Sequence, residues 1–207
     1  SRAAQRLAVG DLRARTGMAN EGGELGELAQ TFDSMAEALE RRAQASGEHE
    51  KALVHRSLQQ TVVGALGQFA LVNTDLDALL QQAVILVTQT LELEYSYVFE
   101  FKGDANPAVL RAGVGWKEEL HGKASVETGP GSQVRFVIDA GQPIVHEDLA
   151  SEPRFTPPAL LKDNGVVSGV TVSISGRETL FGVLGVGTTK RRKFTEDEVH
   201  FLLAVAT

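Results

Sequence analysis

Residues 166–174 have the sequence VVSGVTVSI, and residues 179–189 have the sequence TLFGVLGVGTT. Both runs are rich in β-branched residues, and Gly176 stands in the short segment between them. Such runs, bounded by turn residues, predict strands. Because the connection is short, the two strands are expected to pair as an antiparallel hairpin. This hairpin is the expected centre of a β-sheet.

Further strands are predicted on the N-terminal side of the hairpin. Residues 95–101, YSYVFEF, alternate strictly, which predicts a strand with one aromatic face. That face would carry Tyr95, Tyr97, Phe99 and Phe101. Two more short strands are expected, in residues 108–116 (AVLRAGVGW) and residues 143–149 (PIVHEDL).

Helices are predicted before, between and after these strands. Residues 75–91 have helical apolar spacing, with a capping box from Thr74 to Asp77, and a second capping box joins Thr195 to Glu198 before residues 196–206. Shorter helices are expected in residues 132–143 and 157–165. Strands mixed with helices in this way predict an α+β domain of about 150 residues.

The N-terminal third has a different pattern. Apolar residues recur at alternating spacings of three and four, the narrow stripe of a coiled-coil seam: Leu25, Leu28, Phe32, Met35 and Leu39. A short, otherwise polar helix cannot bury such a seam within one copy. The stripe therefore predicts a parallel homodimer.

A second stripe follows after a polar gap and is out of phase with the first by two residues. It consists of Leu58, Val62, Ala65, Phe69 and Val72. A phase change in a continuous helix requires local over- or underwinding. If the helix transmits a signal, such a place could support two competing packings. Alternatively, the second stripe turns to face the next domain. The pattern leaves both interpretations open.

Composition excludes several classes of function. The chain has 207 residues and a net charge of −7, and residues 58–207 carry 12 basic against 18 acidic side chains, which argues against a nucleic-acid partner. There is no cysteine, so disulfides, thiolate metal sites and catalytic thiols are excluded and a reducing compartment is favoured. No apolar run approaches membrane-spanning length, and no signal peptide is recognisable. The abrupt ends suggest a piece of a longer protein.

Nothing in the spacing of the residues predicts catalysis. No Ser-His-Asp arrangement or paired histidine ligands emerge, and no metal site is expected. His49 lies in EHEK, which is only a fragment of a kinase phospho-acceptor box, and no nucleotide-binding kinase core is present. His49 is therefore expected to be an exposed helix residue.

The first 42 residues resemble a HAMP domain, the relay found just inside the membrane in bacterial sensor proteins. The resemblance rests on LAVGDLRAR (7–15) and GGELGELAQTFDSMAEAL (22–39), and it departs from the family at Thr16 and Gly23 and in a truncated first helix. It implies two parallel helices per chain, a long connector that lets both point the same way, and a four-helix bundle in the dimer. The implied relay residues are Gly10, Leu12, Met18 and Glu24.

Residues 58–207 resemble a GAF domain, a small-molecule-binding sensor module. The best-matching stretches are PIVHEDLASEPRF (143–155), residues 165–189 and RRKFTEDEVHFLLAVA (191–206). The resemblance implies a central six-stranded antiparallel sheet with a ligand over one face. By position it implies a pocket lined by Phe99, Trp116, Val134, Phe136, Phe155, Leu160, Ser168 and Val170. Ordinary core packing of the same residues is the alternative.

No cofactor is required by these patterns. Haem would use His121 or His146 as its axial ligand, whereas a covalent bilin, or the chemistry of GAF-fold methionine-sulfoxide reductases, would need cysteines that this chain lacks. Cyclic-nucleotide-binding members have an Asn-Lys…Phe…Asp-Glu pattern, of which Lys190, Phe194, Asp197 and Glu198 are a partial version with Thr189 in place of the Asn. A structural Lys190–Asp197 ion pair is the alternative.

The two resemblances together predict a non-catalytic signalling module: a HAMP domain in 1–42, a connecting helix in 43–73 and a GAF domain in 74–207. It would be the cytoplasmic, dimeric part of an inner-membrane sensor, joined to the membrane only through an upstream helix and soluble as a fragment. The expected output domain is a histidine kinase of a two-component system, or else a diguanylate cyclase. The alternative is a ligand-free spacer that only dimerises.

Overall fold

The computed structural model of the chain describes residue 6 and residues 11–13, 24–72, 75–102, 105–176 and 179–207. The chain divides into two compact units, Ser1–Ser57 and Leu58–Thr207. Helix α2 (Glu24–Val72) contributes residues to both units. In the part of the chain that is described, no helix combines the length and hydropathy that crossing a bilayer requires.

In the first unit, Arg13 of the segment 11–13 contacts α2. The guanidinium Nε of Arg13 lies 3.6 Å from Oε1 of Glu40, and Arg6 forms a 2.6 Å ion pair with Asp11. Ala29 and Ala36 of α2 are buried. Most of the predicted connector lies outside the described residues, so its course along the second helix stays a prediction.

The predicted relay and seam residues lie only partly within the described residues. Gly10 and Met18 lie outside them, whereas Leu12 is half-buried and Glu24 begins α2. Met35 and Leu39 of the seam are 50% and 41% exposed in the single chain. Nothing is described of the side chains of Glu24, Leu25, Leu28, Phe32 and His49, so the predictions that concern them stay predictions.

The second unit contains a six-stranded sheet in which every neighbouring pair is antiparallel, as predicted. The strand order is β3-β2-β1-β6-β5-β4, so the predicted hairpin β5–β6 lies next to the aromatic strand β1. The strands are β1 (Tyr95–Lys102), β2 (Ala105–Val114), β3 (Ser125–Val126), β4 (Ile144–His146), β5 (Ser168–Ser175) and β6 (Leu180–Thr188).

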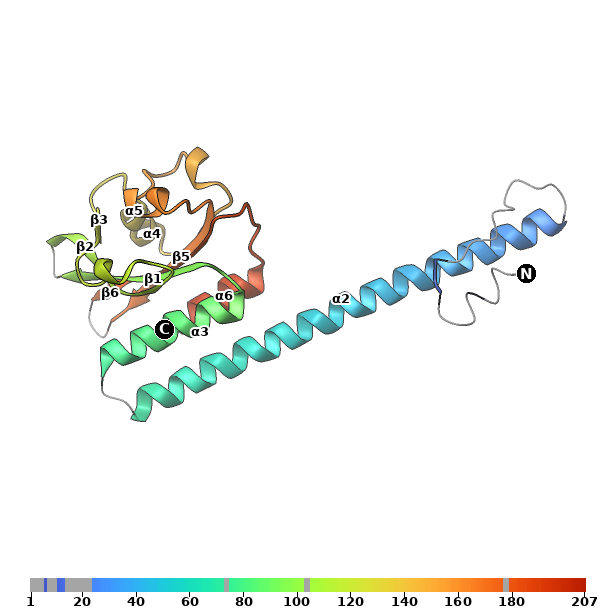
Figure 1. The fold of residues 1–207 in the computed structure, drawn as a ribbon, viewed down its shortest axis with the longest axis horizontal. Coiled ribbons are helices and arrows are strands. Elements are labelled where there is room, and N and C mark those ends of the chain that lie inside the picture. Colours follow the sequence, from blue (N-terminus) through green and yellow to red (C-terminus); the bar gives the residue numbers. More distant parts are fainter. Residues whose placement is uncertain (1–5, 7–10, 14–23, 73–74, 103–104, 177–178) are drawn as a thin grey trace. The chain divides into compact units, whose positions relative to one another are not determined.

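Helices cover both faces of this sheet (Figure 1). Helices α3 (Leu76–Leu91) and α6 (Glu196–Val205) lie on one face, which we call the helix face. Helices α4 (Gln133–Ala140) and α5 (Ala159–Asp163) lie on the other, together with the single turns η1 (Glu118–Leu120) and η2 (Leu149–Ser151). We call this second face the ring face, because it carries the aromatic side chains of β1.

Each face has its own hydrophobic cluster, because successive side chains of a strand point to opposite sides of a sheet. The helix-face cluster consists of Val62, Leu66, Leu80, Val84, Val87, Leu91, Leu93, Val98, Ala112, Val170, Val172, Leu184, Val186, Phe194, Phe201, Leu202 and Ala206. The ring-face cluster consists of Tyr97, Phe99, Ala108, Leu110, Trp116, Val126, Val134, Val137, Ile144, Leu149, Phe155, Leu161, Val166 and Val183.

Side-chain caps fix the ends of these helices. The Thr195–Glu198 capping box of α6 is present as predicted. For α3, the expected capping box from Thr74 to Asp77 is wrong, since Asp75 is the N-cap and accepts hydrogen bonds from the backbone of Asp77 and Ala78. A carboxylate one residue later caps two free N–H groups by itself; Thr74 lies outside the described residues.

The end of α2 packs on the helix face of its own unit. Val62 and Leu66 are buried in the helix-face cluster, whereas Leu58 is 48% and Val72 is 89% exposed. Val62 thus follows the interpretation in which the helix turns toward the next domain. The buried positions are Gln59, Val62 and Leu66, spaced by three and four, and the predicted stripe omitted Gln59 and Leu66.

Candidate functional site

The ring face is built on strand β1, whose alternation places Tyr97 and Phe99 on the same side. Tyr97 and Phe99 are 2% and 1% exposed, and Tyr95 and Phe101 pack against the same cluster. The aromatic face predicted for residues 95–101 is therefore confirmed. The centre of this face is filled by side chains.

Two rings on this face lie directly against glycines. A Cβ at Gly185 would overlap the ring of Tyr97, and a Cβ at Gly169 would lie 2.8 Å from Cε1 of His146. Only glycine leaves enough room for such a close approach of a ring to the backbone of the sheet. Gly185 and Gly169 therefore set the positions of the Tyr97 and His146 rings.

A buried polar group links the sheet to helix α4. The Tyr97 hydroxyl and Thr171 Oγ1 lie 3.0 Å apart, and Gln133 Nε2 donates to Thr171 Oγ1 at 3.2 Å. All three side chains are at most 2% exposed. Burial raises the pKa of Tyr97 to about 12, against the smaller opposing effect of the hydrogen bond to Thr171. The hydroxyl of Tyr97 is therefore neutral at physiological pH.

His146 is the other buried polar side chain of the ring face. It is 2% exposed, and neither ring nitrogen has a hydrogen-bond partner among the described residues. Its ring meets the edge of Phe155 at a centroid distance of 6.3 Å. Burial lowers the pKa of His146 to about 4, an effect that Glu152 opposes and Arg154 reinforces. The imidazole is neutral at pH 7, with two unsatisfied nitrogens.

Arg154 lies over two rings at the outer edge of this region. Its guanidinium donates to the Glu152 carboxylate at 2.6 and 2.7 Å and to the carbonyl oxygen of Val145 at 2.6 Å. The same group lies 5.8 Å from the ring centroid of Phe136 and 6.0 Å from that of Phe155. Arg154 thus ties the segment after β4 to the aromatic side chains below it.

Six of the eight predicted pocket residues lie on the ring face, and two do not. Those on it are Phe99, Trp116, Val134, Phe136, Phe155 and Leu160. The prediction for Val170 is corrected, because this residue packs in the helix-face cluster and not on the ring face. The prediction for Ser168 is also corrected, because Ser168 lies two residues before Val170 on the same strand and so faces the same side. Its hydroxyl donates to the carbonyl oxygen of Glu147 and accepts from the backbone N–H of Arg192.

The sequence analysis missed the polar residues of this face. Tyr97 was placed on the correct side but omitted from the pocket, and Gln133 and Thr171 were not considered. Tyr97 had a signal, since its hydroxyl stands on the face that the alternation places inside, whereas Gln133 and Thr171 had none in the local spacing. His146 was considered only as a haem ligand. The second candidate for a haem ligand, His121, is half-buried just after η1.

A cavity of about 550 Å³ lies at the edge of the ring face. Its walls come from β3, from the loop before α4 and from the start of α5. Val126 and Leu160 belong both to these walls and to the packing of the ring face. Of the predicted pocket residues, Leu160 alone lines this cavity.

The partial cyclic-nucleotide pattern has structural roles. Glu198 caps α6 and pairs with Arg192, and Phe194 is buried beneath the Arg192 guanidinium at 5.2 Å. Arg192 also donates to the carbonyl oxygen of Leu91 at 3.0 Å. Among the described residues, no ion pair joins Lys190 to Asp197. Arg192, two residues after Lys190, and Glu198, one residue after Asp197, form the pair that braces α6.

The geometry of the sheet and its two covered faces agrees with the comparison with known families. A model of the GAF domain matches residues 75–207. The chain belongs to the GAF family. A model of the HAMP domain matches residues 1–41, so a HAMP domain precedes the GAF domain. Both are regulatory domains, and the chain is a signal-transduction sensor module.

Solved structures of other GAF domains share this fold. The GAF domain of a phosphoenolpyruvate-protein phosphotransferase from Coxiella burnetii has 18% identity and a TM-score of 0.65, over 73% of this chain and 89% of that one. Free methionine-R-sulfoxide reductase from Neisseria meningitidis has 16% identity and a TM-score of 0.60, over 75% of this chain and 86% of the reductase. A phycocyanobilin-bound GAF domain of a cyanobacterial phytochrome has 16% identity and a TM-score of 0.59, over 72% and 89%. No protein of curated function matches the chain.

Proposed function

We propose that the chain is the non-catalytic relay and sensing part of a dimeric, membrane-bound bacterial receptor, with domain limits at 1–42, 43–73 and 74–207. The GAF domain would bind a small uncharged molecule on its ring face and alter the packing of α2, α3 and α6. The output domain that receives this signal is a histidine kinase or, as the second choice, a diguanylate cyclase. The HAMP–GAF pairing supports this assignment, because it joins a relay to a sensor fold.

The observation that carries the sensing role is the unpartnered imidazole of His146. A buried polar atom without a hydrogen bond costs about 1–3 kcal/mol, so such atoms are rare outside functional sites. Around it the wall is aromatic and the imidazole is neutral. A flat, uncharged molecule with a hydrogen-bond donor or acceptor would satisfy this site.

The cavity beside β3 supplies a route to the ring face. Leu160 lies between the cavity and the aromatic cluster, at the start of the five-residue helix α5. Displacement of this short helix would join the cavity of about 550 Å³ to the rings. Cavities of roughly 300–1,000 Å³ are typical of small-molecule sites.

A hydrogen-bonded path leads from the ring face to the helix face. The indole N–H of Trp116 donates to the carbonyl oxygen of Ser96 at 2.7 Å. The hydroxyls of Ser96 and Thr88 lie 2.6 Å apart, and both reach the carbonyl oxygen of Val84 in α3. A ligand that moves the Trp116 ring would thereby act on α3. Its effect cannot exceed its difference in affinity between the two packings.

Changes at the single tryptophan of the chain test this proposal. A set of neutral aromatic heterocycles is titrated against the whole chain while Trp116 emission is recorded. We expect at least one compound to give a saturable change that His146→Leu abolishes. His200→Leu, at an exposed position of α6, is the matched control and should leave binding intact. Equal binding by both variants would overturn the proposed role of His146.

Dimer formation is the second part of the proposal. Met35 and Leu39 are half-exposed in the single chain, as expected of a seam that a second copy covers. Sedimentation of the whole chain should give a dimer at micromolar concentration. Leu39→Glu should shift it to monomer, whereas Ala38→Glu, at the adjacent exposed position, should not. A monomeric parent chain would contradict this part.

A ligand-free spacer is the competing function, and the filled ring face favours it. Tyr97 and Phe99 occupy the centre of the face without a ligand. In that case no compound would change Trp116 emission, although the dimer would still form. The two measurements therefore separate the sensor from the spacer.

A further inference from the structure

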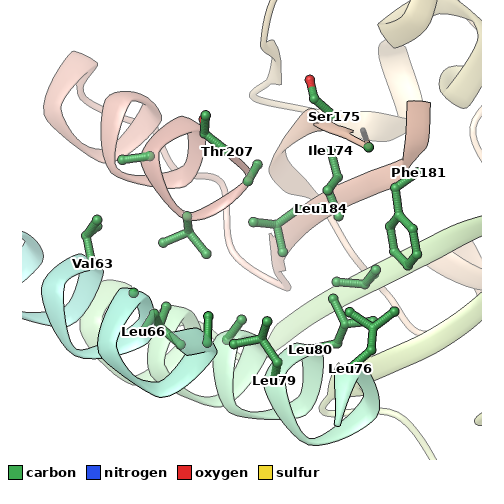
Figure 2. A pocket seen from close by; sticks show the side chains of 18 residues that line it. Val63, Leu66, Leu76, Leu79, Leu80, Ile174, Ser175, Phe181, Leu184 and Thr207 are labelled. Carbon is green, nitrogen blue, oxygen red and sulfur yellow. The ribbon is translucent and has the colours of Figure 1, made fainter. Parts of the chain in front are cut away.

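A second cavity, of about 500 Å³, lies on the opposite side of the sheet from the ring face (Figure 2). It lies within the second unit, where the end of α2, helix α3, the end of α6 and the β5–β6 hairpin meet. Leu66, Leu79, Leu184 and Phe181 project toward this space from three of these elements (Figure 2). The proposed ring-face site has no part in it.

The lining of this cavity is uncharged. No Lys, Arg, His, Asp or Glu is among the lining residues in the described part of the chain, and its polar side chains are Ser175 and Thr207. Transfer of a charged group to such a wall is unfavourable without a partner charge. The cavity therefore excludes anions and cations and favours a neutral, mainly apolar molecule.

The space is open because the helices present small residues to it. Gly67 and Ala70 of α2, Ala83 of α3 and Ala204 of α6 all line the cavity. Leucines at these positions would close it. The lining residues come from α2, α3, α6 and the β5–β6 hairpin, so the cavity has walls on several sides.

We infer that this cavity binds a small neutral molecule with an apolar, aromatic or alkyl body and one polar group. The body lies against Leu66, Leu79 and Phe181, and the polar group remains at the open side of the cavity, where the lining residues Ser175 and Thr207 are exposed. Its volume is within the range of roughly 300–1,000 Å³ that small-molecule sites occupy. A molecule bound here would bridge the end of α2 to the end of α6 and so stabilise one arrangement of the relay helices.

The neutral fluorophore N-phenyl-1-naphthylamine, which brightens in apolar surroundings, is the probe for this site. We expect a saturable increase in its emission with the whole chain. Gly67→Leu fills the cavity and should weaken binding by at least about tenfold. Gly64→Leu is the matched control: both glycines are exposed in α2 with nothing within 4 Å of an added Cβ, but only Gly67 lines the cavity.

The inference would be overturned by no saturable binding of the probe, or by equal binding to the two glycine variants. It would also be overturned if the probe emission fell as the chain dimerised, because a second copy would then occupy the cavity. Sedimentation at each protein concentration detects the last case. Circular dichroism checks that each variant folds. If Gly67→Leu does not fold, Ala70→Phe, at an exposed position of the same wall, provides the same test. His146→Leu should not affect the probe, so this test is independent of the ring-face proposal.

Discussion

The two faces of one sheet are packed in different ways. On the ring face, Tyr97 and His146 lie directly against backbone at Gly185 and Gly169, and polar atoms are enclosed among rings. On the helix face, aliphatic side chains from three helices pack together and leave a cavity lined by small residues.

This difference separates specificity from mobility. The Tyr97 and His146 rings lie directly against the backbone at two glycines, so these two rings cannot shift without moving the sheet. On the helix face, small residues of α2, α3 and α6 leave a space beside the packed aliphatic side chains, so this face is better suited to two alternative packings. We therefore expect the two fixed rings to restrict the shape of a ring-face ligand, and the helix face to permit movement.

The largest effect is expected at Gly185. Gly185→Val places a side chain where the Tyr97 ring lies, and overpacking of this kind should lower the free energy of unfolding by about 3 kcal/mol or more. Gly64→Ala, in the exposed part of α2, should instead raise it by about 0.5–1 kcal/mol, since alanine is the better helix former. Urea unfolding measures both. Similar changes in the free energy of unfolding for the two variants would contradict the close packing of Tyr97 against Gly185.

The next effect concerns pH. The unfolded chain binds a proton at His146 below the ordinary pKa of 6.5, whereas the folded protein does so only below about 4. The free energy of unfolding should therefore fall as the pH drops from 6.5 to 4, by up to about 3 kcal/mol. His146→Leu should remove this part of the slope. His200→Leu should keep it, and a parent chain with no slope in this window would refute the buried neutral imidazole.

The smallest effect is expected at the Tyr97 hydroxyl. Tyr97→Phe removes one hydrogen bond to Thr171, which keeps its bond to Gln133, so the loss should be about 1 kcal/mol. Tyr95→Phe, at the half-buried neighbour on the same face, should change stability by less than about 0.5 kcal/mol. Thermal or urea unfolding of the two variants compares them. If Tyr95→Phe lost more stability than Tyr97→Phe, the hydrogen bond of the Tyr97 hydroxyl would not be the stabilising one.

The fold was predictable because its signals are local. Alternation in residues 95–101 placed Tyr97 and Phe99 on one face, and the Thr195–Glu198 capping box marked the start of α6. Strand pairing then joined segments whose patterns were already clear. These features depend on periods of two residues and on caps, which a single sequence displays.

The site was less predictable because it depends on how strands are paired. Val170 pairs with Val186, which in turn pairs with Ser96, so these three side chains share the helix face. Nothing within residues 166–174 fixes which of its two alternating sets faces the rings. The assignment of Ser168 and Val170 to the pocket failed for this reason.

Other features depended on contacts between distant segments. The imidazole of His146 is buried only because Gly169 of the neighbouring strand lets it approach the sheet. Arg192, and not the Lys190 of the alternative interpretation, forms the ion pair, because its guanidinium reaches both Glu198 and the carbonyl oxygen of Leu91. Neither arrangement has a signal in the local spacing of residues.

The central claim is that the ring face binds a small uncharged molecule through His146. Native mass spectrometry of the freshly purified chain, with His146→Leu and His200→Leu treated identically, tests it most directly. The account predicts a dimer with reproducible extra mass for the parent chain and His200→Leu, and no extra mass for His146→Leu. The same extra mass in all three proteins, or none in the parent chain, would contradict it.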